Sequence, residues 1–262
     1  MMRTLGFRCI AGLKPCATSC FMRMWRSPLG LRVAVALCLL ACSTACGRSD
    51  RPPPSSVTTV SEPAVAPTRA SAPRIVILGD SLTAGLGLPA GAAYPSLLQQ
   101  RVDASGLSYE VVNAGVSGDT SAGGLSRLDW ALQGDVRVLV VALGGNDALR
   151  GLPPDQLQKN LAQIIERAQA GGATVVLAGM ESPTNWGRDY NVSFHRVYTT
   201  LADTYHLPLV PFLLQGVAGS EVLNQADGIH PTTEGARIVA DNVWAVLKPV
   251  LERQRRNGRT GS

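Results

Sequence analysis

Short apolar runs alternate with amphipathic stretches along the second part of the chain, from about residue 74 onward. Runs rich in Val, Ile and Leu and bounded by glycine or polar residues predict five buried strands, over residues 74–78, 110–113, 136–143, 173–178 and 207–210. Helical spacing of apolar residues predicts five helices, over residues 94–102, 122–132, 154–170, 192–205 and 233–251. This alternation predicts one α/β domain, over residues 74–252, with a five-stranded parallel sheet and helices on both faces.

Groups of residues that could take part in catalysis follow three of the predicted strands. Gly79-Asp80-Ser81-Leu82 comes after the first strand, Asn113-Ala114-Gly115 ends the second, and Gly144-Gly145-Asn146-Asp147 follows the third. A fourth group, Asp227-Gly228-Ile229-His230-Pro231, precedes the last helix. Each group alone is consistent with an ordinary turn or helix cap, but turn chemistry does not explain four of them in this order. Right-handed crossovers bring the carboxyl ends of parallel strands to one edge, so we expect the groups to meet there.

Acyl transfer is the chemistry that needs this set of side chains. A serine hydroxyl is a weak nucleophile and requires an adjacent base, which histidine provides near neutral pH. A carboxylate must then orient the imidazole and stabilise its charged form. Ser81, His230 and Asp227 fill these roles, since an Asp three residues before a His can reach the ring from the same turn. The amides of Ser81 and Gly115 and the Asn146 side chain are candidate donors to the oxyanion.

These four groups resemble the conserved blocks of the SGNH, or GDSL, hydrolase family, and within it the bacterial periplasmic thioesterase, arylesterase and lysophospholipase branch. The resemblance covers about residues 75–251. It implies a three-layer α/β/α flavodoxin-like fold, no metal or other cofactor, and activity on small-molecule esters and thioesters, lysolipids included. It assigns the nucleophile to Ser81, the oxyanion donors to Ser81, Gly115 and Asn146, and the acid and base to Asp227 and His230.

The segment 183–191 resembles the loop beside the acyl-binding groove of the same branch. On that basis we expect Trp186 and Tyr190 to line a substrate groove. The match is looser here than in the four blocks, because Trp186 stands where a smaller aromatic residue is expected. The acyl-chain preference therefore does not follow from the resemblance.

The charge is distributed unevenly along the chain. The formal net charge is +5, but residues 1–73 hold nine Lys and Arg against two Asp and Glu, and residues 74–262 hold fifteen against seventeen. The predicted domain is therefore mildly acidic and lacks the basic surface that a nucleic-acid partner requires. All six cysteines lie within the first 46 residues, which excludes a disulfide, a thiolate metal site and a catalytic cysteine from the domain.

The first 73 residues have the pattern of an export leader followed by a tether. Three arginines precede a short apolar run over residues 33–41, which is typical of a secretory signal and too short to span a bilayer. Leu39-Leu40-Ala41-Cys42 resembles a bacterial lipobox, and Cys46 closes a second, poorer one; ordinary cleavage near Ala45 without a lipid is the alternative. Residues 1–46 are interpreted as the leader, residues 47–73, with six prolines, as a flexible linker, and residues 253–262 as a basic disordered tail. These features predict an exported, periplasmic protein that is either free or anchored by a lipid.

Two other functions remain open from the sequence. One is a carbohydrate O-acetyl esterase, because related hydrolases remove acetyl groups from sugars. The other is a lipoprotein that binds a lipid or a glycan without hydrolysing it, although the complete Ser, Gly, Asn and His set argues against it. The nucleophile elbow Gly-x-Ser-x-Gly of α/β-hydrolases does not occur, and no phosphate-binding loop is present. Nothing in the sequence predicts the oligomeric state.

Overall fold

The computed structural model describes residues 72–260, with side chains described to residue 257. Five strands form one sheet in the order β2-β1-β3-β4-β5, and every neighbouring pair is parallel. The strands are β1 (Arg74–Gly79), β2 (Glu110–Gly115), β3 (Val136–Ala142), β4 (Thr174–Ala178) and β5 (Leu209–Val210). All five lie within or next to the runs that the apolar pattern predicts, and β1, β3 and β4 consist mainly of buried apolar residues.

Helices connect the strands and complete the fold. The helices that follow β1 and β2 are α1 (Ser81–Ala84), α2 (Tyr94–Ala104), α3 (Ser121–Ser126) and α4 (Leu128–Ala131). Those that follow β3, β4 and β5 are α5 (Gly145–Leu149), α6 (Pro154–Ala170), α7 (Arg188–Tyr205) and α8 (Thr233–Thr260). Two single 3-10 turns, η2 (Ala90–Ala92) and η3 (Thr184–Trp186), precede α2 and α7.

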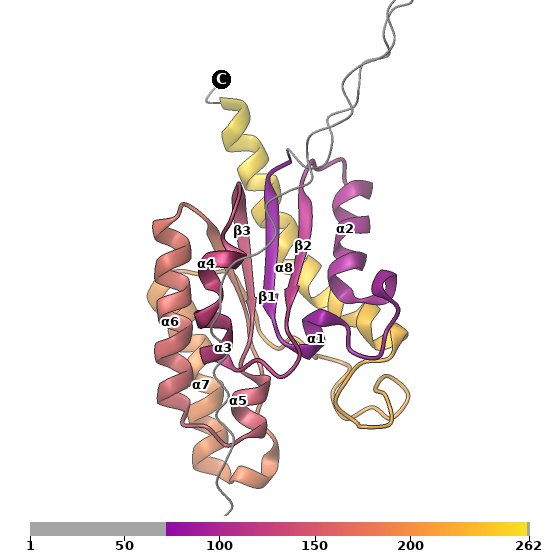
Figure 1. The fold of residues 1–262 in the computed structure, drawn as a ribbon, viewed down its shortest axis with the longest axis vertical. Helices are drawn as coiled ribbons and strands as arrows, with labels where there is room; N and C mark the ends of the chain where they lie inside the picture. Colours follow the sequence, from indigo (N-terminus) through magenta and orange to yellow (C-terminus); the bar gives the residue numbers. More distant parts are fainter. Residues whose placement is uncertain (1–71, 261–262) are drawn as a thin grey trace, which may run out of the picture. The chain divides into compact units, whose positions relative to one another are not determined.

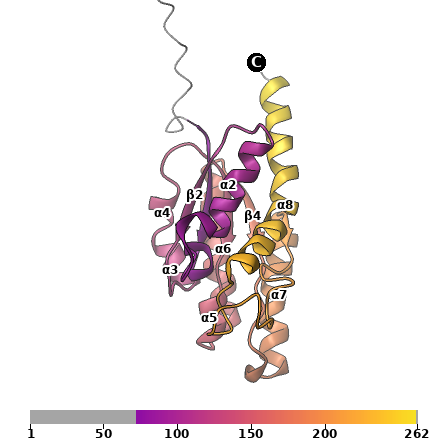
Figure 2. The ribbon, with the colours of Figure 1, turned by 90° about the vertical axis from the view of Figure 1, so that its right-hand side faces the viewer.

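The helices form a layer on each face of the sheet. Helix α2 packs against α8, whereas α6 packs against both α3 and α7. In Figure 1 the strands β3, β1 and β2 lie between α6 and α3 on one side and α2 on the other. In Figure 2, α3 and α4 lie on one side of the strands and α8 on the other. The result is a three-layer α/β/α sandwich, as the sequence predicts.

The strand register determines where the four sequence groups meet. Gly79 at the end of β1 pairs with Gly115 at the end of β2 and with Ala142 at the end of β3. The chain therefore leaves all three strands at one level of the sheet. Asp80 and Ser81 come directly after Gly79, and the Gly144-Gly145-Asn146-Asp147 segment comes directly after β3, so the two segments emerge side by side.

The predicted helix over residues 122–132 is in fact two short helices that meet at Arg127. The Arg127 backbone, at φ −108° and ψ 11°, leaves the helical conformation. The Arg127 guanidinium donates to the Ala114 carbonyl at 2.7 Å and to the Gly79 carbonyl at 2.8 Å. These contacts turn the side chain toward the strand ends, and a helical periodicity of apolar residues cannot reveal such a contact.

The C-terminal helix is longer than the sequence predicts. The sequence predicts a helix that ends near Leu251 and a disordered tail from residue 253, but α8 continues to Thr260. Gln254 in this extension donates to the Arg137 carbonyl at 3.2 Å and to Thr174 Oγ1 at 3.0 Å, and it accepts from the Tyr109 hydroxyl. These contacts tie the extension to the start of the sheet. The apolar pattern misses them because they are polar.

Candidate active site

The short helix α1 positions Ser81. Asp80 caps this helix, because its Oδ1 accepts from the Leu82 N–H at 3.0 Å. Ser81 is the first residue of α1, so its own N–H has no acceptor within the helix and points outward at the helix start. The hydroxyl and the amide of one residue are therefore presented together at the edge of the sheet.

A tight loop before α8 carries Asp227 and His230. The Gln225 N–H donates to the His230 carbonyl at 2.7 Å, and an antiparallel bridge joins Asn224 to Pro231, so the loop is closed at its base. Gly228 at the tip has φ 69°, a left-handed conformation that glycine adopts without strain. Within the loop, Asp227 Oδ1 accepts from the His230 N–H at 3.0 Å, which holds the carboxylate against the histidine.

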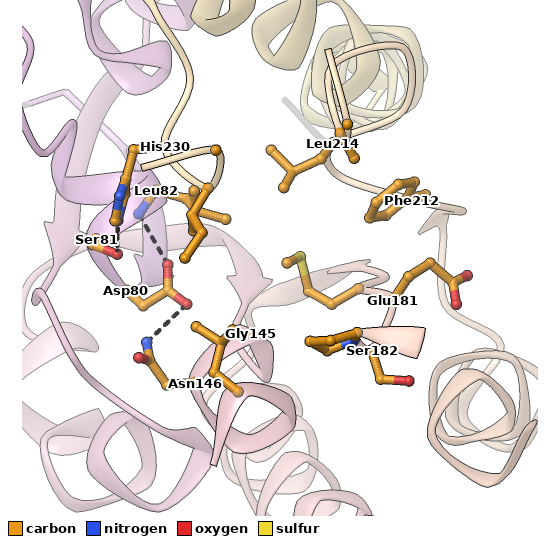
Figure 3. Close-up of a pocket in the computed structure, with 17 residues that line it drawn as sticks. Asp80, Ser81, Leu82, Gly145, Asn146, Glu181, Ser182, Phe212, Leu214 and His230 are labelled. Carbon is orange, nitrogen blue, oxygen red and sulfur yellow. Dashed lines mark hydrogen bonds between the residues drawn. The ribbon is translucent and has the colours of Figure 1, made fainter. Parts of the chain in front are cut away.

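Ser81, His230 and Asp227 form a continuous chain of hydrogen bonds. Ser81 Oγ lies 2.8 Å from His230 Nε2, and His230 Nδ1 lies 2.6 Å from Asp227 Oδ2 (Figure 3 shows the first contact). Hydrogen bonds from the His230 N–H, from its ring and from the Ile229 N–H hold the pKa of Asp227 well below its usual range. Asp227 is therefore ionised at neutral pH, and it favours the tautomer with its proton on Nδ1 and Nε2 free toward the serine.

Asn146 lies beside the same serine and is already held in place. Its side-chain amide donates to the Asp119 carbonyl at 2.9 Å and, more loosely, to Asp80 Oδ2 at 3.3 Å (Figure 3). Asp80 is almost completely buried, and this burial raises its pKa to about 6 against the opposing effects of the Leu82 N–H and His230. Besides capping α1, Asp80 is one of the residues that line the cavity beside Ser81.

A buried polar network supports the segment that carries Asn146. Asp147 is 1% exposed, and it accepts from the Ser121 N–H at 2.7 Å and from the Ser121 hydroxyl at 2.5 Å. Asn160 of α6 donates to the same hydroxyl at 2.9 Å. The network joins α5, which carries Asn146, to α3 and α6.

Arg127 is a residue of the site that the sequence does not single out. Besides its bonds to the ends of β1 and β2, it donates to Asp119 Oδ2 at 2.6 Å. Asp119 is the residue whose carbonyl holds Asn146. One guanidinium thus connects the segments of Ser81, Gly115 and Asn146. An arginine inside a helical pattern carries no sequence signal for such a role.

Gly115 does not reach the cavity in this structure. Its N–H donates to Asn113 Oδ1 at 3.0 Å, and it is not among the residues that line the space beside Ser81. A Cβ at this position would lie 2.3 Å from the Ala84 nitrogen, so glycine is required for the close approach of β2 to α1. Of the three residues predicted to supply oxyanion donors, Ser81 and Asn146 line the cavity and Gly115 does not.

An elongated cavity of about 340 Å³ opens from the Ser81 hydroxyl. Its lining is mostly apolar, and the larger side chains are Leu82, Leu149, Met180, Phe212, Leu214 and Ile229. Figure 3 shows Ser81, Asp80 and His230 at one end and Phe212 with Glu181 at the other. The only titratable side chains of the lining are Asp80, Glu181 and His230. A cavity of this shape and polarity accommodates the hydrophobic part of a ligand next to a hydroxyl.

Trp186 and Tyr190, which the sequence predicts beside a substrate groove, are not among the residues that line this cavity. The Tyr190 hydroxyl donates to the Leu152 carbonyl at 2.9 Å, and the Trp186 ring lies against Gly151. Both side chains thus cover the turn between α5 and α6. The cavity wall comes instead from Met180, Glu181 and Pro183, which precede the aromatic pair in the same loop.

Several of the sequence predictions concern residues that the structure does not describe. The leader, both lipobox cysteines, Cys42 and Cys46, and residues 47–71 of the linker lie outside the described residues. Among the residues that are described, no helix is both long and apolar enough to cross a bilayer. The same part of the chain holds no cluster of three or more His, Cys, Asp or Glu side chains that could bind a metal ion.

Comparisons with known proteins identify relatives over most of the domain. Residues 77–238 match the GDSL-like Lipase/Acylhydrolase family. Esterase TesA of Pseudomonas aeruginosa is 47% identical over 184 residues, which are 70% of this chain and 92% of the relative. Thioesterase 1/protease 1/lysophospholipase L1 of Escherichia coli K12 is 40% identical over 183 residues, 70% of this chain and 86% of the relative. A crystal structure of TesA has a TM-score of 0.65 at 46% identity and covers 67% of this chain and 98% of its own.

The family match covers more than half of the chain, and the matches to the two relatives each cover 70% of it. Both matches contain Ser81 and the strand ends that surround it. The resemblance inferred from the four sequence groups is therefore confirmed, and this chain belongs to the GDSL-like lipase/acylhydrolase family, the SGNH hydrolases, as an enzyme of the esterase type.

Proposed function

We propose that the chain is a serine ester hydrolase in which Ser81 is the nucleophile, His230 the general base and acid, and Asp227 the carboxylate that orients the imidazole. The observation that carries the proposal is the unbroken contact from Ser81 Oγ through His230 to Asp227, with distances of 2.8 and 2.6 Å. The first distance is within hydrogen-bond reach of a nucleophile and its base, and the second is a hydrogen bond that orients the base.

The reaction follows from this geometry in two halves. Ser81 Oγ bonds to the acyl carbon of the substrate while its proton passes to His230 Nε2. When the tetrahedral intermediate collapses, the bond to the alcohol or thiol breaks, and the leaving group takes that proton from Nε2. Water then attacks the acyl-enzyme, gives a proton to Nε2, and the carboxylic acid leaves as Ser81 recovers its hydrogen. Asp227 stays ionised throughout and stabilises the imidazolium that forms in each half.

The oxyanion is stabilised by the Ser81 N–H and by one N–H of the Asn146 side chain. The Asn146 bond to Asp119 fixes the amide, and the longer bond to Asp80, at 3.3 Å, is the one that the oxyanion replaces. Each donor of this kind typically contributes about 2.7–4 kcal/mol to the transition state. The Gly115 amide would join them only by exchanging its bond to Asn113.

The substrates are small-molecule carboxylic esters and thioesters with an apolar acyl group, lysolipids included. The apolar lining supports this class, because a methylene chain removes those side chains from water, whereas an acetylated sugar would leave them in contact with a polar ring. The names of the relatives, an esterase and a thioesterase/lysophospholipase, agree with this class. The apolar lining and the names of the relatives together disfavour a carbohydrate O-acetyl esterase and a binding protein without turnover.

We further propose that the enzyme works outside the cytoplasm, in the periplasm. The support is the sequence of its first 46 residues, a charged stretch, a short apolar run and a small-residue cleavage region. The mass of the mature N-terminus, determined for the wild type and for Cys42→Ala and Cys46→Ala, would identify a lipidated cysteine or show that neither carries a lipid.

Hydrolysis of p-nitrophenyl acyl esters and acyl thioesters by the purified protein tests the assignment. Ser81→Ala should lower kcat by at least about 10⁴-fold. Ser182→Ala is the matched control, because Ser182 lines the same cavity but makes no contact with His230. Full activity in Ser81→Ala, or no hydrolysis of any activated ester by the wild type, would contradict the proposal.

A further inference from the structure

The cavity beside Ser81 has one charged side chain at its far end. Figure 3 shows Glu181 next to Phe212, on the opposite side of the cavity from Ser81 and His230. Asp80 and His230 belong to the reaction centre, so Glu181 is the only carboxylate that the rest of the lining contains. Glu181 thus places a carboxylate at the end of the cavity that lies opposite Ser81.

Glu181 is held in this position by a hydrogen bond to a histidine ring. His195 of α7 lies with Nδ1 at 2.7 Å from Glu181 Oε1, and the two side chains are 54% and 41% exposed. The backbone beneath them is tied as well. The Gly179 N–H donates to the Val210 carbonyl and the Leu213 N–H donates to the Gly179 carbonyl, both at 2.8 Å. These bonds join the two segments that carry Glu181 and Phe212, so the far wall of the cavity is a fixed structure.

From this arrangement we propose that Glu181, oriented by His195, sets the upper limit of acyl-chain length. The inference rests on the proposed function and names a specificity-determining residue for it. Each methylene placed against the apolar wall gains about 0.8 kcal/mol, so kcat/KM should rise roughly fourfold per methylene as the chain lengthens. A methylene that reaches Glu181 covers a carboxylate instead and removes water from it, which is unfavourable. The gain per methylene therefore stops at this residue.

The test is a series of p-nitrophenyl esters from acetate to palmitate, each below its micelle concentration, with kcat/KM measured for four variants. Glu181→Met keeps the length of the side chain and removes the charge, and Glu181→Gln keeps its shape and polarity. His195→Ala leaves the carboxylate but releases it from its partner. Glu252→Met is the matched control, because Glu252 forms an ion pair with Lys248 on α8 and does not line the cavity.

We expect the wild-type profile to rise and then level off or fall. In Glu181→Met the rise should continue to longer esters, with a gain of at least roughly tenfold for the longest esters and less than about twofold for acetate and butyrate. Glu181→Gln and His195→Ala should shift the profile in the same direction by smaller factors. Glu252→Met should give the wild-type profile.

A Glu181→Met profile that superimposes on the wild type would overturn the inference, as would an equal gain for all esters. This failure is distinct from a failure of the proposed function. In the first case the wild type and all variants hydrolyse esters and Ser81→Ala does not. In the second case the wild type hydrolyses none of them. Circular dichroism spectra of the variants verify that each one is folded.

Discussion

The two halves of the reaction centre differ in how they are supported. Asp227 and His230 lie in an exposed loop, and Asp227 is 45% exposed at its side chain. Asn146, Asp80 and Asp147 lie at the floor, where Asp80 and Asp147 are 3% and 1% exposed. The loop half is held by hydrogen bonds within a single turn, whereas the floor half is held by bonds between different helices. Activity should thus depend on both halves, and the stability of the fold mainly on the floor.

The two carboxylates nearest to His230 illustrate the same contrast. Asp227 accepts three hydrogen bonds in contact with solvent, and its pKa is lowered. Asp80 is buried, and its pKa is raised to about 6. Proximity to the histidine is therefore not what selects the acid of the triad. The carboxylate that accepts a hydrogen bond from the ring is the one whose charged form is stabilised by its surroundings.

The largest effect is expected from the loop half. Asp227→Asn keeps the size of the side chain but presents an amide to His230 Nδ1, which favours the wrong tautomer. We expect kcat/KM for a p-nitrophenyl ester to fall by about 10⁴-fold. The free energy of unfolding, measured with urea, should change little because the side chain is exposed. A large loss of stability in this variant would show that the loop is part of the structural core.

A variant at the floor of the site should lose both catalytic activity and stability. Asp147→Ala removes a buried carboxylate and leaves the Ser121 N–H and hydroxyl without this acceptor. Two hydrogen bonds to a charged group predict a destabilisation of about 3–5 kcal/mol in urea unfolding. We also expect a loss of kcat of about 10²-fold, because Asn146 is displaced.

Ser121→Ala is the milder control for this network, since it removes the hydroxyl and retains the N–H donor to Asp147. Its destabilisation should be clearly smaller than that of Asp147→Ala. If Asp147→Ala keeps wild-type stability, the floor is not the stabilised half of the site, and the comparison between loop and floor does not hold.

The smallest effect concerns the pH dependence of stability. The pKa of Asp80 is about 6 in the folded state against an ordinary value of 3.8. Between these values the unfolded carboxyl is ionised while the folded one keeps its proton, so stability falls as the pH rises through this window. The shift corresponds to roughly 3 kcal/mol, which the folded state loses between pH 4 and 7. Asp227, with a lowered pKa, has the opposite sign, because its contribution is lost as the pH falls below the ordinary range of Asp.

Asp80→Asn isolates the Asp80 contribution. The difference in unfolding free energy between the wild type and Asp80→Asn should decrease steadily from pH 4 to pH 7. A difference that is independent of pH would show that Asp80 is ionised in the folded state over the whole range, which is inconsistent with its burial.

The sequence predicted the parts of the molecule that depend on local patterns. The order of strands and helices followed from apolar periodicity, and the contact between Asp227 and His230 from their spacing of three residues. The convergence of Ser81 with this pair followed from the rule that parallel strands end at one edge. These inferences need no knowledge of side-chain packing.

The parts that the sequence missed depend on contacts between distant residues. The cavity residues Met180, Phe212 and Leu214 have the composition of an ordinary core. Trp186 is predicted from the sequence to line a substrate groove, but its ring lies against Gly151. Arg127 ends a helix because of bonds to strand carbonyls some 13 and 48 residues away in sequence. Periodicity and motif spacing contain no information on such pairs.

The central claim is that Ser81 is a nucleophile activated by His230. Covalent labelling by a fluorophosphonate, followed by peptide mass spectrometry, tests it most directly because the adduct forms only on an activated serine. The account predicts a single adduct, on Ser81, at a rate that falls sharply in His230→Ala, and no adduct in a folded Ser81→Ala variant. An adduct on another residue, or undiminished labelling of Ser81→Ala, would contradict it.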